Sequence, residues 1–183
     1  FSADDNKIMD WSFGGFWLSG DTLFGNGGRL MTASVSGNDL TTTVSPTGVQ
    51  TQAIRMLFGA SGAFSTQGQI RLLAVNNNSI YYANPSDERC DGIYFDYSFA
   101  DINGQGMNLQ FEGNQMRNIT GIGLGVRMIS ARTVNAQNEV TGLSYVTNLS
   151  ISNNQLHRNS DALAWVLPDP ANQPANLNLY LLN

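Results

Sequence analysis

The sequence predicts an all-β protein, and the simplest architecture is a two-sheet antiparallel β-sandwich of the jelly-roll kind. About ten short segments alternate apolar and polar side chains, which is the pattern of a half-buried strand. Turn-forming residues separate these segments every ~8–12 positions, as they do in sandwiches. No segment shows the spacing of a convincing amphipathic helix. An irregular β-helix is the alternative, because asparagine-rich turns suit it too, although no repeat of fixed period is visible.

The first 28 residues form an apolar N-terminal segment. Two of the three tryptophans, Trp11 and Trp17, lie in residues 1–28. Such a segment is either the first strand of the core or an arm that docks on another subunit. Residues 29–183 are expected to form a single β-sandwich domain, which includes a C-terminal strand at 177–182.

Two pairs of strands in this domain are expected to form hairpins. Residues 29–35 and 40–44 flank a four-residue turn with glycine and asparagine. Residues 93–99 and 107–111 alternate clearly on both sides of a glycine-containing turn, and they are the best hairpin in the chain.

Other segments fit strands with different surroundings. Residues 53–58 and 69–75 are more continuously apolar than the other segments, as central strands covered on both faces would be. In residues 122–128, glycine at alternate positions removes side chains from one face, so another backbone can approach closely. Further strands are expected at residues 80–82, 142–152 and 177–182.

The composition indicates a surface that a neighbouring molecule can cover. Hydrophobic residues make up 42% of the chain, enough for a sizeable core, whereas charged residues make up only 13%. Soluble proteins average about 25% charged residues. A surface of Asn, Ser, Thr and Gly can be buried against a neighbour without stranding charges. This favours assembly or binding over catalysis.

Charge and hydropathy exclude several partners. The net charge is −5 and Lys7 is the only lysine, so the chain lacks the basic clusters that nucleic acids need. No polybasic run and no apolar run of ~18 residues is present, so we expect neither nucleic-acid binding nor membrane insertion. The absence of an initiator Met and the shortage of lysine favour a secreted protein at the cell surface.

A weak calcium-loop pattern is the best signal for a metal ion in the sequence. Asp101, Asn103 and Gln105 alternate before a glycine, and Glu112 follows eleven positions after the aspartate. The flanking residues alternate with period two, whereas a helix–loop–helix site needs a period of 3.6. A hairpin turn is therefore the favoured interpretation, with calcium as the alternative.

The chain offers little for catalysis. Its single histidine, His157, and single cysteine, Cys90, lack the flanking motifs of a nucleophile pair. Cys90 is expected to be a small buried hydrophobe, or a thiol that links two chains. The carboxylates Asp96 and Glu112 lie on neighbouring expected strands, a placement that is common in sandwiches and does not specify a glycosidase. We expect a protein that is not an enzyme.

Two kinds of surface feature concern sugars. Acceptor triplets for N-linked glycans occur at Asn77, Asn118 and Asn148, although chance produces such matches in a chain this rich in Asn, Ser and Thr. Aromatic residues that could stack on sugar rings are Trp11, Trp17, Tyr81, Tyr82, Tyr94 and Trp165.

The sequence as a whole therefore predicts a structural subunit that assembles with copies of itself. The product would be an extracellular fibre, a pilus-like filament or a virion coat, built by β-strand exchange between subunits. The alternative is a carbohydrate-binding or adhesive module for surface glycans, with or without the assistance of calcium. The residues expected at the subunit interface are Ile8, Trp11, Phe13, Phe16, Trp17, Leu18, Leu177, Leu179 and Leu181.

Overall fold

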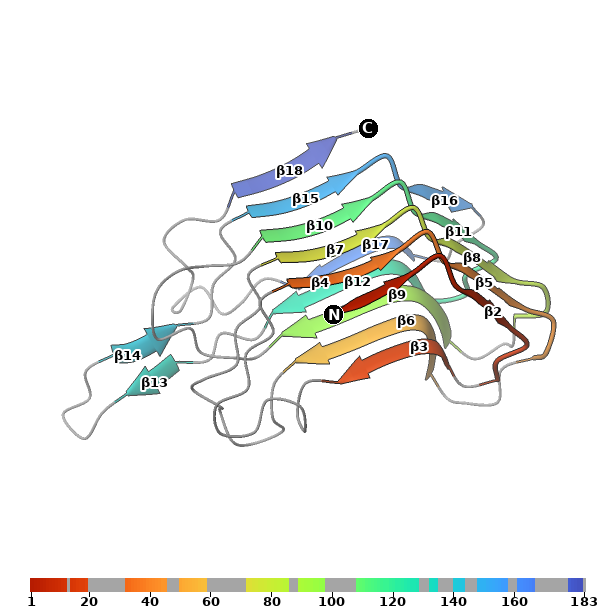
Figure 1. The fold of residues 1–183 in the computed structure, drawn as a ribbon, viewed down its shortest axis with the longest axis horizontal. Coiled ribbons are helices and arrows are strands. Elements are labelled where there is room, and N and C mark those ends of the chain that lie inside the picture. The colour runs from red at the N-terminus through yellow and green to blue at the C-terminus, as the bar shows by residue number, and fades with distance from the viewer. Residues whose placement is uncertain are drawn as a thin grey trace.

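A computed structural model shows the fold of the chain (Figure 1). The residues that it describes are 1–12, 14–19, 32–45, 50–58, 72–85, 89–97, 108–128, 132–134, 140–143, 148–157, 161–166 and 178–182. Strands account for all the regular structure in these ranges, so the all-β prediction is confirmed. Within the same ranges, no helix is long and apolar enough to cross a membrane.

Sixteen of the eighteen strands form three sheets in which every neighbour is parallel. The first sheet contains, in spatial order, β1 (Ser2–Asp4), β4 (Thr32–Ser36), β7 (Leu72–Asn76), β10 (Asn108–Glu112), β15 (Asn148–Ser152) and β18 (Asn178–Leu182). The second contains β2 (Lys7–Met9), β5 (Asp39–Thr42), β8 (Ser79–Tyr82), β11 (Gln115–Arg117) and β16 (Gln155–His157). The third contains β3 (Gly14–Ser19), β6 (Gln50–Phe58), β9 (Arg89–Tyr97), β12 (Ile122–Met128) and β17 (Asp161–Val166).

The chain visits the three sheets in turn, so each set of three strands is one coil of a parallel β-helix. The first coil is β1–β2–β3, and each later coil stacks on the one before it. β1 and β18 are the two edges of the first sheet, at opposite ends of the stack, as Figure 1 shows. The alternative architecture from the sequence is therefore the one observed.

The predicted antiparallel sandwich is wrong. In the described ranges the only antiparallel pair is β13 (Arg132–Val134) with β14 (Val140–Leu143). Alternation reports that a strand has one buried face, but it carries no information about the direction of the neighbouring strand. The expected hairpin turn between 29–35 and 40–44 is a corner that carries the chain from the first sheet to the second, where β5 pairs with β2 and β8.

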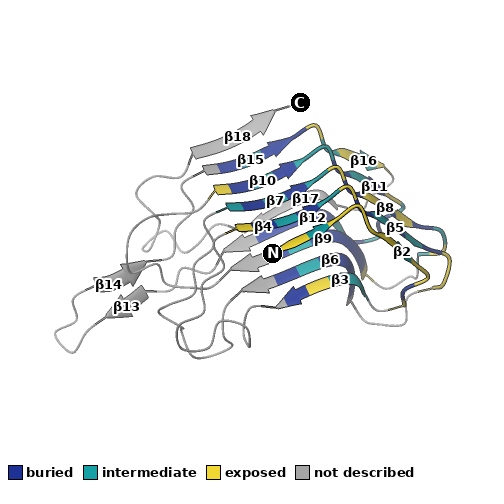
Figure 2. Ribbon diagram, in the orientation of Figure 1, coloured by how far each residue is buried: buried dark blue, intermediate teal, exposed yellow. Residues whose placement is uncertain are grey.

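The core fills the space that the three sheets enclose. Side chains at equivalent positions of successive coils form columns, and one column of the first sheet holds Val35, Val75, Phe111 and Ile151, all buried. Leu40, Ile80 and Met116 form a column of the second sheet, and Ile54, Ile93 and Leu124 a column of the third. Figure 2 shows this buried interior beside the more exposed strands β1 and β2. Fully burying each large apolar side chain contributes ~1.5–3 kcal/mol, so the columns dominate the stability of the fold.

The described part of the apolar N-terminal segment, residues 1–12 and 14–19, is part of this helix. β1, β2 and β3 pair with β4, β5 and β6 of the same chain, so they form the first coil rather than a free arm. Each of these strands is the outermost strand of its sheet. A role of the same residues in contacts with another subunit stays a prediction.

Candidate functional site

A six-residue pattern marks every corner between the first and second sheets. It reads apolar–any–corner residue–Asn–any–apolar, and its five copies are ADDNKI, VSGNDL, VNNNSI, FEGNQM and ISNNQL. The corner residue has a positive φ of 55–70° in each copy, a conformation that Gly, Asn and Asp tolerate best. These corner residues are Asp5, Gly37, Asn77, Gly113 and Asn153.

The asparagine after each corner residue joins a ladder that runs along the helix. In the step from Asn38 to Asn78, the backbone N–H and the Nδ2 of Asn38 both donate to Asn78 Oδ1, at 3.1 and 2.9 Å. The Nδ2 of Asn78 also donates backwards, to the carbonyl of Val35 in the preceding coil at 2.8 Å. Each asparagine amide therefore bridges the coils on both sides of it.

The same bonds recur along the ladder. Its members are Asn6, Asn38, Asn78, Asn114 and Asn154, and every step has both donations to Oδ1 at 2.9–3.1 Å. Successive members are 32, 40, 36 and 40 residues apart. This unequal spacing explains why no fixed period is visible in the sequence.

The interior members of the ladder and its first member have different surroundings. Asn38, Asn78 and Asn114 are at most 3% exposed, and such buried amides are stable only because their hydrogen bonds are made. Asn6 is exposed. Its Oδ1 accepts no hydrogen bond from the described residues, and its Nδ2 donates to Asp4 O of its own coil at 3.2 Å.

An apolar hollow of about 650 Å³ lies beside this free acceptor, at the free edge of the first coil. Its apolar lining is Phe1, Ala3, Ile8 and Phe16, and its polar lining is Ser2, Asp4, Asn6 and Lys7. The rings of Phe1 and Phe16 are 6.1 Å apart, and Phe1 is 51% exposed. Ile8 and Phe16 are only partly buried, although they pack against the core. We call the edges of β1, β2 and β3, together with this hollow, the open first coil.

Two carboxylates at the open first coil are held ionised by hydrogen bonds. Asp4 accepts from the hydroxyls of Ser2 and Ser34 and from the Ser36 N–H, and these bonds lower its pKa. Asp10 accepts from the hydroxyl and N–H of Thr43, which lower its pKa as well.

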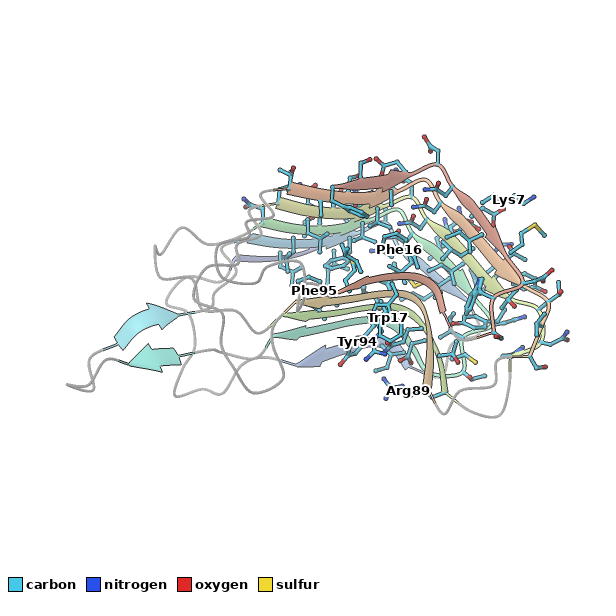
Figure 3. The ribbon with its side chains drawn as sticks, turned by 60° about the horizontal axis from the view of Figure 1, so that its bottom comes forward. Lys7, Phe16, Trp17, Arg89, Tyr94 and Phe95 are labelled. Carbon is cyan, nitrogen blue, oxygen red and sulfur yellow. The ribbon has the colours of Figure 1, made fainter. Side chains whose placement is uncertain are left out.

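A second candidate surface lies on the outer face of the third sheet. Trp17, Arg55, Tyr94 and Gly125 are neighbours in register on four successive strands. Trp17 is 51% exposed, and the guanidinium carbon of Arg55 is 4.5 Å from its ring centroid. The Tyr94 ring lies over Gly125, since a Cβ on this glycine would be 3.0 Å from Tyr94 Cδ2. We call these four residues the aromatic–arginine row; Figure 3 shows Trp17 and Tyr94 on this sheet, with Phe95 turned into the interior.

Asp91 is a buried carboxylate with a structural role. It is fully buried, and its Oδ1 accepts from Arg89 Nε at 2.8 Å and from the Ile122 N–H at 2.7 Å. The hydroxyl of Tyr82 donates to the Asp91 carbonyl at 2.8 Å, and burial raises the pKa of Tyr82 far above its usual value. These bonds tie β9 to β8 and to the start of β12, and they leave Tyr82 unsuited to proton transfer.

The other candidates for catalysis are not brought together. Cys90 is buried in β9 of the third coil, and its N–H donates to Thr120 Oγ1 at 3.0 Å. His157 is exposed at the end of β16 in the fifth coil. The side chain of Asp96 lies outside the described residues.

The weak calcium pattern falls largely outside the described residues, which include only Glu112 of its four members. Asp101, Asn103 and Gln105 are not among them. Glu112 ends β10, and its Oε1 accepts from Ser150 Oγ at 3.0 Å. In the described ranges no three His, Cys, Asp or Glu side chains are grouped as metal ligands.

The three glycan acceptor triplets lie in different settings. Asn77 is an exposed corner residue with a φ of 56°. Asn118 also has a positive φ, and its Nδ2 donates to the Tyr82 carbonyl at 3.1 Å, a bond that a glycan would weaken. Asn148 begins β15, and its side chain is not described.

The expected interface residues other than Trp17, which belongs to the aromatic–arginine row, divide into three groups. Ile8 and Phe16 line the hollow, and Leu18 is buried in β3. Trp11 is only 7% exposed and packs edge-on against Tyr82 with ring centroids 4.8 Å apart, so neither ring offers the exposed sugar platform that we expected. The third group is incompletely described: Leu179 and Leu181 lie in β18 with side chains not described, and Phe13 and Leu177 lie outside the described residues.

Sequence reasoning missed the ladder and the pairing of Arg55 with Trp17. The ladder could have been found from the six-residue pattern, because in each copy an asparagine has an apolar residue three positions before it and another two positions after it.

Comparison with known proteins returned no match to a family model, to a curated protein or to a solved structure.

Proposed function

We propose that the protein is a non-enzymatic structural subunit, exposed outside the cell, that assembles when strands of another copy add to its open first coil. The proposal is supported by the first coil of the described residues, in which three outermost strand edges, a hollow lined by Phe1, Ile8 and Phe16 among others, and an Asn6 Oδ1 that accepts no bond from those residues lie together.

Strand addition is the ordinary way to satisfy such an end. An exposed strand edge presents unpaired N–H and C=O groups, and it pairs readily with another chain. Solenoids are extended by stacking, since each repeat contacts only its neighbours and a terminal repeat must be capped to stay single. A contact between unlike ends does not close on itself, so it produces a filament rather than a dimer.

The apolar side chains supply the driving force. Covering Phe1, Ile8 and Phe16 would complete the burial of three side chains, each of which gives at most ~1.5–3 kcal/mol on full burial. That sum is comparable to the lower estimates for the loss of translational and rotational freedom on association. The strand hydrogen bonds then decide whether assembly is favourable.

Assembly can be measured by sedimentation velocity over a range of concentrations. We expect wild-type chains to form species larger than a monomer as concentration rises, and Phe1→Ser to raise the required concentration by about tenfold. Tyr81→Ser is the matched control, because Tyr81 is an exposed aromatic on β8, an interior strand of the second sheet. A wild-type chain that stays monomeric at high concentration, or equal effects of the two variants, would contradict the proposal.

The aromatic–arginine row favours a second function, the binding of surface glycans. An exposed tryptophan ring offers a face for stacking on a sugar, and an arginine beside it can donate hydrogen bonds to hydroxyl groups. Gly125 has no side chain, so the Tyr94 ring can lie close to the sheet. A chain of sugars could then lie along the aromatic–arginine row.

A glycan array tests this second function. We expect saturable binding that is lost in Trp17→Ala and reduced in Tyr94→Ala, whereas Tyr81→Ala on the second sheet leaves it unchanged. Loss of binding on chelation would additionally implicate calcium. Absence of binding to every glycan would exclude this function for the array's ligands.

A further inference from the structure

Arg55 is a cation without an anionic partner on the outer face of the third sheet. It lies in β6, in register with Trp17 of β3 and Tyr94 of β9, so neither of its neighbours across the strands carries a charge. Its guanidinium contacts the Trp17 ring, and among the described residues it forms no ion pair. Its Nε is shielded from solvent and has no hydrogen-bond partner there. The described part of the chain therefore leaves the charge of Arg55 uncompensated.

This part of the outer face lies away from the edges of the stack. β6 and β9 each have a neighbouring strand on both sides in the third sheet. Arg55 and Tyr94 are half-buried between those neighbours, and only the outward direction remains open to a ligand. A ligand of Arg55 therefore approaches the face of the sheet and needs no free strand edge.

One carboxylate, that of Asp96, lies close to Arg55 along the sheet. Asp96 follows Tyr94 by two residues in β9, on the next outward row, and its side chain is not described. In register it is the neighbour of Arg127 in β12 and of Leu57 in β6. Because cross-strand neighbours of opposite charge attract each other, the register assigns Asp96 to Arg127. Arg55 stays available for a charge from outside the chain.

The two rings beside Arg55 have different roles. The guanidinium carbon is 4.5 Å from the Trp17 ring centroid, a cation–π contact that holds the charge in place on the sheet. The Tyr94 ring lies on the other side of Arg55, over Gly125 of the next strand. Figure 3 shows Trp17 and Tyr94 on this sheet. Tyr94 is thus the ring beside the charge on which a sugar can stack.

We propose that the aromatic–arginine row binds a sugar that carries a carboxylate, with Arg55 as the ligand of the carboxylate and Tyr94 as the surface on which the sugar ring stacks. The proposed binding of surface glycans is the premise, and the carboxylate narrows the glycan to the uronic acids. Neighbouring strands are ~4.8 Å apart. The carboxyl carbon of a uronic acid is bonded directly to the sugar ring, so a ring on Tyr94 places this group within one strand spacing, beside Arg55.

A carboxylate suits the guanidinium of Arg55 in shape and charge. Both groups are planar, and arginine can donate two parallel hydrogen bonds to the two oxygens of one carboxylate. The net charge of the chain is −5, so long-range attraction does not bring an anion to the protein. The affinity must come from short-range contacts with Arg55 and the ring beside it.

Isothermal titration of the whole chain with a hexamer of mannuronic acid tests the class of glycan. The comparison ligand is the same hexamer with its carboxylates converted to methyl esters, which keeps the sugar rings and removes the charge. Hydrogen bonds to charged groups are stronger than those to neutral groups, so we expect the ester to bind about ten- to a hundredfold more weakly. EDTA in every titration prevents calcium from bridging the carboxylates. A change in the ligand leaves the folding of the protein untouched.

The variant Arg55→Gln locates the carboxylate. If Arg55 contacts it, the substitution weakens binding of the acid by a similar factor and leaves binding of the ester unchanged, because both changes remove the same contact. Arg117→Gln is the matched control, since Arg117 is an exposed arginine on the second sheet, and it should alter neither affinity. Tyr94→Ala should weaken binding of the acid and the ester equally, because stacking does not depend on the charge.

The outcomes separate this proposal from its premise. Equal binding of the acid and the ester, or additive losses from esterification and Arg55→Gln, would overturn the role of the carboxylate and leave glycan binding standing. Tighter binding of a sulfate ester of a neutral hexamer would also overturn it, because sulfate would then be the recognised anion. If no glycan binds, acidic or neutral, the proposed glycan binding fails together with this proposal.

Discussion

The middle and the start of the asparagine ladder contain the same residue type in the same corner, but they differ in what surrounds it. Asn78 is 1% exposed, and its side chain makes four hydrogen bonds to the coils on both sides. Asn6 is exposed, and its side chain makes two. The interior asparagine is thus part of the framework, whereas the first one retains an unused bonding capacity. The number of hydrogen bonds that this repeated residue makes to other described residues therefore depends on its place in the stack.

The sharpest test of this difference compares Asn78→Ala with Asn6→Ala. The interior substitution leaves buried donors and acceptors without partners, so we expect it to lower the free energy of unfolding by ~3–5 kcal/mol. The same change at the exposed end should cost less than ~1 kcal/mol. Urea unfolding followed by circular dichroism measures both. Equal losses would show that the ladder does not distinguish its end from its middle.

A second comparison uses the corner residues. Gly113→Ala places a Cβ against Asn77 Oδ1 at a φ of 66°, and we expect a loss of ~2–4 kcal/mol from the clash and the backbone strain together. Asn153→Ala is the control, because it changes an exposed corner residue of similar φ that already has a Cβ. It should cost only ~1 kcal/mol. A Gly113→Ala variant as stable as Asn153→Ala would mean that the corner has room that the structure does not show.

The smallest expected effect concerns pH. Asp4 occupies the position that Asn76 occupies two coils later, and both accept a backbone N–H of the next coil. Hydrogen bonds from Ser2 and its neighbours lower the pKa of Asp4 below its usual 3.8 in the folded state. The stabilisation is therefore present above pH ~4 and is lost as the pH falls through the lowered value.

We accordingly expect Asp4→Asn to reduce the fall in urea midpoint between pH ~5 and pH ~2, with little change at pH 7. Asp10 should contribute in the same direction, because bonds from Thr43 lower its pKa too. An unchanged acid dependence in Asp4→Asn would show that this carboxylate does not link folding to protonation.

The sequence allowed the strands to be found but not their partners. The expected strands at 29–35 and 40–44 overlap β4 and β5, because the buried Val35 and Leu40 alternate with half-buried polar neighbours. Their pairing with residues ~30–40 positions away could not be found from alternation, which is identical in parallel and antiparallel sheets. The asparagine-rich turns are visible in the sequence, but their unequal spacing hides the repeat of the coils.

Some residues of the candidate site could be predicted from the sequence, and others could not. Ile8, Phe16 and Trp17 stand out as apolar residues in an unusual N-terminal segment, and all three lie at the free edge of the stack. Arg55 could not be linked to Trp17, because that contact depends on the register between β3 and β6. Nothing in the sequence distinguishes Asn6 from other polar residues. Only the ladder shows that its Oδ1 accepts no hydrogen bond from the described residues.

The connections between sheets differ in how much change they tolerate. From the first to the second sheet, every complete coil uses the same two-residue corner, fixed by the ladder. From the third sheet back to the first the connections are longer, and the one after β12 contains the antiparallel pair β13–β14. A protein engineer could therefore insert a foreign epitope in the connection that contains β13–β14, while the two-residue corner between the first and second sheets kept its register.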